Sequence, residues 1–178
     1  MKGHHLILGK TTDWLTGEVL DDTLDERLRQ KIARFLVEEK GHAKEDIRPR
    51  LPLKARAGER EAVVTVDFTV TAGGRTAMIV RFGPGSIVTR HRPGLAASRL
   101  VAPYQVPVVV VTNGEDADIL DGATGKVLGH GLPAIPGQEE LARLAAAYDF
   151  PPVPPERREK EGRILHAFEA VGACNCED

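Results

Sequence analysis

Residues 60–83, REAVVTVDFTVTAGGRTAMIVRFG, decide the fold of this chain. In the first half, apolar residues recur at every second position, which is typical of a β-strand with one buried face. The residues on that face are Val64, Val66, Phe68 and Val70. The pair Gly73-Gly74 predicts a tight hairpin turn, because glycine readily adopts a left-handed backbone. The return strand, residues 75–82, is apolar on both faces, so we expect it inside a sheet.

The segment before this hairpin has helical periodicity. Between residues 24 and 36, apolar side chains recur at helical spacing, so we expect an amphipathic helix there. Thr23 and Glu26 have the spacing of a capping box at its start, and Gly41 marks its end. Two prolines within residues 48–55 then indicate an edge strand, because proline cannot donate to a sheet ladder.

The segment after the hairpin predicts a crossover. Residues 93–102 form a short helix opened by proline, and the β-branched run 108–111 forms a strand buried on both faces. A strand, a crossover helix and a second strand make a parallel pair. A hairpin with its turn at residues 123–125 and two helices, 138–148 and 156–172, complete the chain.

These elements predict an α/β fold, a mixed sheet flanked by helices, with a C-terminal helical extension. The length of 178 residues fits one main domain. We expect residues 1–135 to form the α/β domain, including the N-terminal segment, and residues 136–178 to form the extension and tail.

Composition excludes several classes of protein. The net charge of -2 argues against a bulk polyanion binder, so any nucleic-acid surface would be a local patch. There is no stretch long enough to span a bilayer and no apolar run typical of a secretory signal, so we expect no membrane partner. The two cysteines lie at the C-terminus and form no disulfide framework, which predicts a reducing, cytoplasmic location.

The order of elements resembles the core of restriction-endonuclease-like nucleases. Residues 24–53, LDERLRQKIARFLVEEKGHAKEDIRPRLPL, resemble the opening of the N-terminal nuclease domain of type I restriction enzyme R subunits. VTVDFTV (64–70) and VVVVTNGEDADIL (108–120) resemble later parts of that domain, so the resemblance covers roughly residues 22–130. It implies a member of the PD-(D/E)xK superfamily and Mg²⁺-dependent cleavage of DNA.

In that family an aspartate ends the second strand and a Glu-x-Lys follows on the third. Asp67 matches the aspartate, but Arg81 stands at the glutamate position and Gly83 at the lysine position. An arginine repels a metal ion, and a glycine cannot help to activate water. We therefore expect a degenerate site in which Asp67 pairs with Arg81 and no cofactor binds. Glu26 resembles the accessory acid of some of these nucleases, although the capping role is the simpler reading.

Basic residues gather around the loop that follows the return strand. They are Arg81, Arg90, His91 and Arg92. Because helix N-termini and arginines both suit phosphate groups, these residues are candidates for nucleic-acid contacts. The alternative is a solvated basic loop. Aromatic residues make up only 4% of the chain, which favours contact with the backbone over base stacking.

The sequence thus predicts a catalytically inactive relative of the R-subunit nuclease domain. It would act as a nucleic-acid-binding or interaction module, with nucleic acid or other protein chains as partners. Two alternatives stay open: an active Mg²⁺-dependent nuclease with relocated catalytic residues, and a purely protein-interaction module. Cys174 and Cys176 supply two of the four ligands of a zinc site, or belong to a tail without a metal role.

Overall fold

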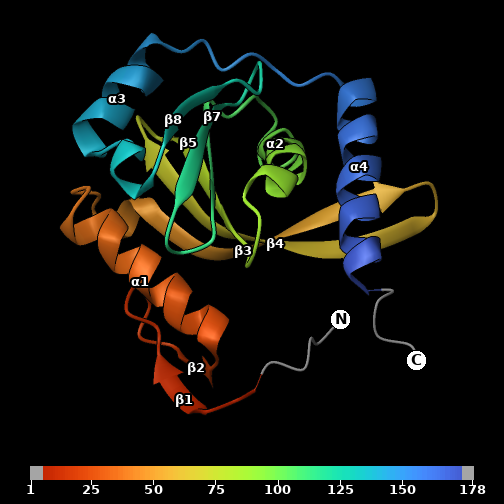
Figure 1. Cartoon of the computed structure of the whole chain (residues 1–178). Helices are drawn as coiled ribbons and strands as arrows, with labels where there is room; N and C mark the ends of the chain where they lie inside the picture. The colour runs from red at the N-terminus through yellow and green to blue at the C-terminus, as the bar shows by residue number, and fades with distance from the viewer. Residues whose placement is uncertain (1–5, 174–178) are drawn as a thin grey trace.

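The computed structural model describes residues 6–173, with side chains as far as residue 168. The strands are β1 (Gly9–Thr12), β2 (Val19–Asp22), β3 (Ile47–Ala57), β4 (Arg60–Ala72), β5 (Arg75–Phe82), β6 (Val108–Thr112), β7 (Ala117–Asp121) and β8 (Val127–His130). The helices are α1 (Leu24–Glu38), η1 (Lys44–Asp46), η2 (Val88–Arg90), α2 (His91–Ser98), η3 (Leu132–Ala134), α3 (Gln138–Ala147) and α4 (Pro155–Ala173). A six-stranded sheet in the order β3-β4-β5-β6-β7-β8 forms the centre, with a separate hairpin β1-β2 (Figure 1). The predicted α/β fold with a mixed, helix-flanked sheet is confirmed.

Strands β3, β4 and β5 form the predicted antiparallel meander. Gly73 and Gly74 turn the chain with φ values of 59° and 76°, a backbone conformation that suits glycine. Strand β5 lies between β4 and β6 and pairs in parallel with β6, which explains why both of its faces are apolar. Helix α2 provides the crossover between these two strands, and β3, with its prolines, is an edge strand.

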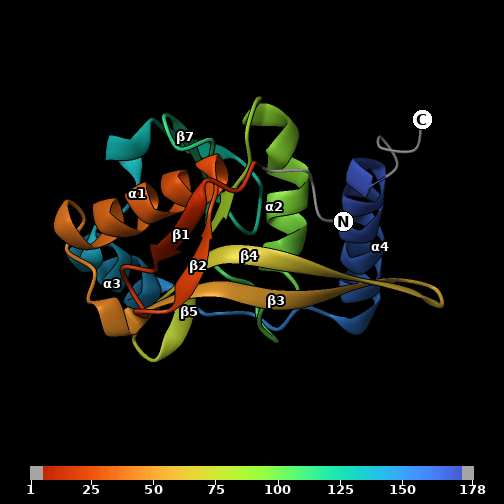
Figure 2. The same ribbon diagram turned by 90° about the horizontal axis from the view of Figure 1, so that it is seen from below.

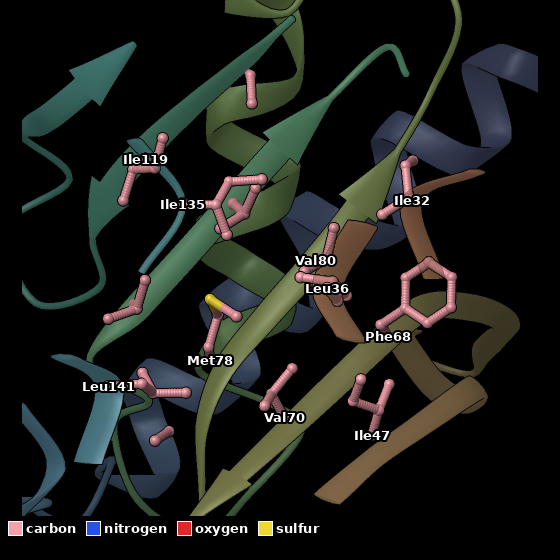
Figure 3. Packing of buried hydrophobic residues seen from close by; sticks show 14 of the residues in the cluster. Ile32, Leu36, Ile47, Phe68, Val70, Met78, Val80, Ile119, Ile135 and Leu141 are labelled. Atoms are coloured by element: carbon pink, nitrogen blue, oxygen red, sulfur yellow. The ribbon is translucent and has the colours of Figure 1, made fainter. Parts of the chain in front are cut away.

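Helices cover both faces of the sheet, α1 and α3 on one side and α2 and α4 on the other (Figure 1). We call the two sets of buried apolar residues core 1 and core 2. Core 1, under α1 and α3, includes Ile32, Leu36, Phe68, Val70, Met78, Val80 and Leu141 (Figure 3). Core 2, under α2 and α4, includes Val64, Val66, Ile79, Leu95, Val109 and Leu165.

Strand β4 changes from one core to the other at Asp67. Val66 packs in core 2, whereas Phe68 packs in core 1. The expectation that residues 64–70 present one continuous apolar face is therefore wrong. On the neighbouring strand β3, Arg50 lies opposite Asp67 in the register and has a φ of 51°. This left-handed backbone interrupts the regular pleat at the point where the side chains change cores.

Helix α4 is fastened to the rest of the fold by polar and close backbone contacts. The buried carboxylate of Glu161 forms an ion pair with Arg99 Nη1 at 2.7 Å. Arg158 donates hydrogen bonds to three carbonyl oxygens that directly follow α2. Helix α4 crosses the outer part of β3 and β4 (Figure 2), and a Cβ added at Gly162 would stand 3.1 Å from the Arg56 carbonyl oxygen. The helix therefore packs directly on the sheet.

Two expectations concern the chain as a whole. The division into residues 1–135 and 136–178 stays a prediction, and the structure adds that α3 packs in core 1 and α4 in core 2. Within residues 6–173, no helix combines the length and the apolar content needed to cross a membrane.

We expect Leu165→Ala to lower the free energy of unfolding by about 2–5 kcal/mol, because it leaves a cavity in core 2. Leu165 is fully buried, with 0% exposure. Phe168→Ala on the same helix is the control and should cost less than about 1 kcal/mol, since 45% of Phe168 is exposed. Urea denaturation followed by circular dichroism measures both, and equal effects would contradict the packing of α4 on the sheet.

Candidate functional site

Asp67 is a buried carboxylate in β4 beside the end of β5. The residue is 3% exposed, and both of its carboxylate oxygens accept hydrogen bonds. Oδ2 accepts from the backbone N–H of Phe82 at 2.8 Å, and Oδ1 accepts from Arg29 Nε at 2.7 Å. A buried carboxylate is costly unless it is paired and hydrogen-bonded. These two donors meet that requirement and fix the carboxylate in place.

The arginine that pairs with Asp67 is not the one expected from the sequence. The register of β4 and β5 does place Arg81 opposite Asp67. Within the described part of the chain, however, the ion pair of Asp67 is formed with Arg29 of α1. The guanidinium of Arg29 also lies over the Phe82 ring, 5.0 Å from its centroid. Asp67 is thus neutralised by a cation from the helix packed on this face, and a contact between Asp67 and Arg81 stays a prediction.

The carboxylate of Glu26 does not complete the predicted capping box. The Thr23 hydroxyl accepts from the backbone N–H of Glu26 at 3.1 Å, so this half of the motif is confirmed. The Glu26 carboxylate instead accepts from Gln30 Nε2 at 2.8 Å. It also lies 3.7 Å from Arg29 Nη1 and 3.9 Å from Arg50 Nη1. The side chain thus belongs to the charged site around Asp67 rather than to the end of its own helix.

Asp13, directly after β1, extends this site, and no motif in the sequence singles it out. The residue is 2% exposed. Its Oδ1 accepts from the backbone N–H groups of Leu15 and Thr16 at 2.9 and 2.8 Å. Its Oδ2 accepts from Arg50 Nη1 at 2.6 Å and from Gln30 Nε2 at 3.0 Å. Burial by itself would raise the pKa of Asp13, but these hydrogen bonds, with that of Arg50 first, lower it to about 2.

We call these charged residues the charge array, which runs in the order Asp13, Arg50, Glu26, Arg29 and Asp67. Each arginine lies between two carboxylates, so the signs alternate along the site. The carboxylates are buried, and the arginine side chains are partly exposed. The array ties α1, β3, β4 and the β1-β2 hairpin together, and Figure 2 shows the hairpin beside α1. Sequence reasoning identified Glu26 and Asp67 but missed the other three.

Arg90 covers Gly83, the position at which the resemblance implies a lysine. A Cβ built on Gly83 would stand 2.7 Å from Arg90 Cζ and 2.9 Å from its Nε, closer than real side chains allow. Arg90 Nη2 in turn donates to the Pro84 carbonyl oxygen at 3.2 Å. A guanidinium therefore lies over Gly83, directly after the end of β5 and two residues along the chain from Arg81.

The other two predicted phosphate contacts, Arg92 and His91, are bound to acidic side chains of other elements. Arg92 Nη1 lies 2.6 Å from the Glu161 carboxylate, so it takes part in fastening α4. His91 Nε2 is hydrogen-bonded to Asp118 at 2.7 Å, and His130 Nδ1 bonds the other oxygen of that carboxylate at 2.6 Å. Burial would raise the pKa of Asp118, but these two imidazoles lower it. Arg81 lies in β5 near its end, and the Arg90 guanidinium covers Gly83, the residue directly after β5.

Mg²⁺, which the resemblance implies, does not fit the residues present. A divalent cation needs carboxylate oxygens that converge on it, but both oxygens of Asp67 are engaged and one of them holds a guanidinium. Arg81 stands where the resemblance implies a second acid. Within residues 6–173, no three His, Cys, Asp or Glu side chains are arranged to hold a metal ion. Cys174 and Cys176 lie outside the described residues, so their zinc role stays a prediction.

We expect Asp13→Asn to lower the free energy of unfolding by about 2 kcal/mol at pH 7. The substitution removes a carboxylate whose pKa is lowered by its ion pair with Arg50. A carboxylate whose pKa is lowered from 3.8 to about 2 stabilises the fold above pH 4. That stabilisation is lost as the pH falls toward the folded-state pKa. The difference between wild type and variant should therefore shrink by about half at pH 3. Chemical denaturation at both pH values checks this, and a difference independent of pH would contradict it.

Comparison with protein families adds to this geometry. A family model described as Type I restriction enzyme R protein N terminus (HSDR_N) matches residues 24–136. Comparisons with curated proteins and with solved structures found no match. The matched segment covers more than half of the chain and includes Glu26, Asp67 and Arg81, while Asp13 lies outside it. The chain therefore belongs to the family of type I restriction enzyme R protein N-terminal domains, as its sequence resemblance implied.

Proposed function

We propose that this chain is a non-catalytic member of its family that binds nucleic acid through the phosphate backbone. One observation carries the proposal. The end of β5, where the family pattern requires an acid and a lysine, carries Arg81 and the guanidinium of Arg90, with Arg29 nearby on Asp67. Guanidinium groups suit phosphate recognition, because they present several donors in a plane and stay charged.

The lack of catalysis follows from the replaced groups. Cleavage of a phosphodiester requires a cation that stabilises the charge of the transition state and a group that activates water. In this chain, one oxygen of Asp67 is bound to Arg29, and Gly83 provides no side chain. The rival function, a nuclease with relocated residues, draws support from the neighbouring carboxylates of Asp13 and Glu26.

Contact with phosphates rather than bases is the expected mode of binding. Arg81 and Arg90 are both partly exposed, and they flank the loop that follows β5. The chain has few aromatic residues to stack on bases. Affinity should therefore depend weakly on sequence and strongly on salt, because neutralised phosphates release condensed cations.

We expect the double variant Arg81→Ala/Arg90→Ala to weaken binding of a fluorescent DNA duplex by about tenfold at low salt. The slope of log K against log salt should become shallower by about 2, since two phosphate contacts are lost. Fluorescence anisotropy over a salt series measures both quantities. Arg143→Ala, an exposed arginine on α3, is the matched control and should leave binding unchanged.

Two outcomes would overturn the proposal in different ways. Plasmid cleavage in Mg²⁺ or Mn²⁺ that disappears in Asp67→Ala would establish the relocated nuclease. A correctly folded wild-type chain that binds neither double- nor single-stranded DNA or RNA at low salt would favour a protein-interaction module.

A further inference from the structure

We propose that the guanidinium groups of Arg29 and Arg50 take the places of cations between three buried carboxylates, so that this site is held together without a metal ion and excludes divalent cations. The inference goes beyond nucleic-acid binding, because it concerns what neutralises the acids of the site.

The first support is the convergence of the carboxylates. The side-chain amide of Gln30 donates from a single nitrogen to Asp13 Oδ2 at 3.0 Å and to Glu26 Oε1 at 2.8 Å. Arg50 Nη1 lies near the same two oxygens, at 2.6 and 3.9 Å. Two acids that share these donors would repel each other strongly without a cation between them.

The second support is that Arg29 lies between Glu26 and Asp67 in the same way as Arg50 lies between Asp13 and Glu26. Its Nε contacts Asp67 at 2.7 Å, and its Nη1 lies 3.7 Å from Glu26. Glu26 thus stands between two guanidinium groups, as a carboxylate that bridges two cations would. The backbone N–H of Phe82 engages the remaining oxygen of Asp67, so an incoming cation would have to displace Arg29.

The third support is the backbone at Arg50. This residue adopts a φ of 51°, which is uncommon for a residue with a side chain. Such conformations persist where the surrounding contacts enforce them. Here the guanidinium of Arg50 reaches Asp13, Glu18 and Glu26. The ion pairs hold the backbone in a conformation that regular strand pairing would not select.

The single tryptophan of the chain provides a built-in probe for the test. The backbone N–H of Trp14 donates to Gln30 Oε1 at 2.8 Å, so its indole lies within energy-transfer range of the charge array. Tb³⁺ bound at the array would therefore emit on excitation of Trp14. Wild type should show no such emission that depends on Asp67, and no rise in melting temperature with millimolar Mn²⁺ or Mg²⁺.

Removing the Arg29 side chain should leave room for a metal ion between the carboxylates of Glu26 and Asp67. We expect Arg29→Ala to melt at a lower temperature than wild type, to gain Tb³⁺ emission, and to recover melting temperature when Mn²⁺ is added. Both gains should vanish in Arg29→Ala/Asp67→Asn. Lys31→Ala, an exposed cation on the same helix but outside the array, is the control and should gain neither.

The proposal does not depend on the folding of one variant. Arg29→Met keeps an apolar chain against Phe82 and should gain the same metal response. Titration of wild type with Tb³⁺, Mn²⁺ or Mg²⁺ tests by itself whether the charge array excludes metal ions. Metal binding by wild type that Asp67→Asn abolishes would overturn the proposal, as would a folded Arg29 variant that binds no metal. Because no readout uses nucleic acid, failure here is distinct from failure of the proposed binding function.

Discussion

The structure depends on how the buried carboxylate of Asp67 is satisfied. The residue lies where β4 passes from one core to the other, so water cannot stabilise its charge. An unpaired charge at such a place would cost several kcal/mol. Arg29 and the backbone N–H of Phe82 remove that cost and fix α1 against the end of β5. Through Glu26 and Arg50 the same requirement extends to Asp13, which fastens the N-terminal hairpin.

The charge array differs from the metal site that the family resemblance implies. The chain keeps acids at two of the places where the resemblance implies metal chemistry, Glu26 and Asp67, but surrounds them with arginines. A guanidinium carries one charge and directs its hydrogen bonds in a plane, and it does not coordinate a water molecule. A bound metal ion does coordinate a water molecule and polarises it. In this chain the guanidinium groups neutralise the acids and hold α1, β3, β4 and the β1-β2 hairpin in position.

Much of the fold follows from local patterns. The helix at α1, the Gly73-Gly74 turn, the two-sided apolar strand β5 and the buried strand β6 were all predictable, because each is encoded within about ten consecutive residues. The β1-β2 hairpin was not, since its short and mostly exposed strands carry no clear period. The switch of β4 between cores was also hidden, because alternation along a strand does not report the backbone of its neighbour, here Arg50.

The sequence by itself determined the class of fold and the family, and it placed Arg81 and Gly83 where the resemblance implies an acid and a lysine. Those conclusions need only residue identity and spacing along the chain. The tertiary structure alone decided which cation neutralises Asp67, that Glu26 leaves its cap, that Arg90 covers Gly83 and that Asp13 joins the site. The reason is physical: ion pairing depends on distances between elements far apart in the chain, such as the 38 positions between Arg29 and Asp67. Those distances are set only when the helices pack on the sheet.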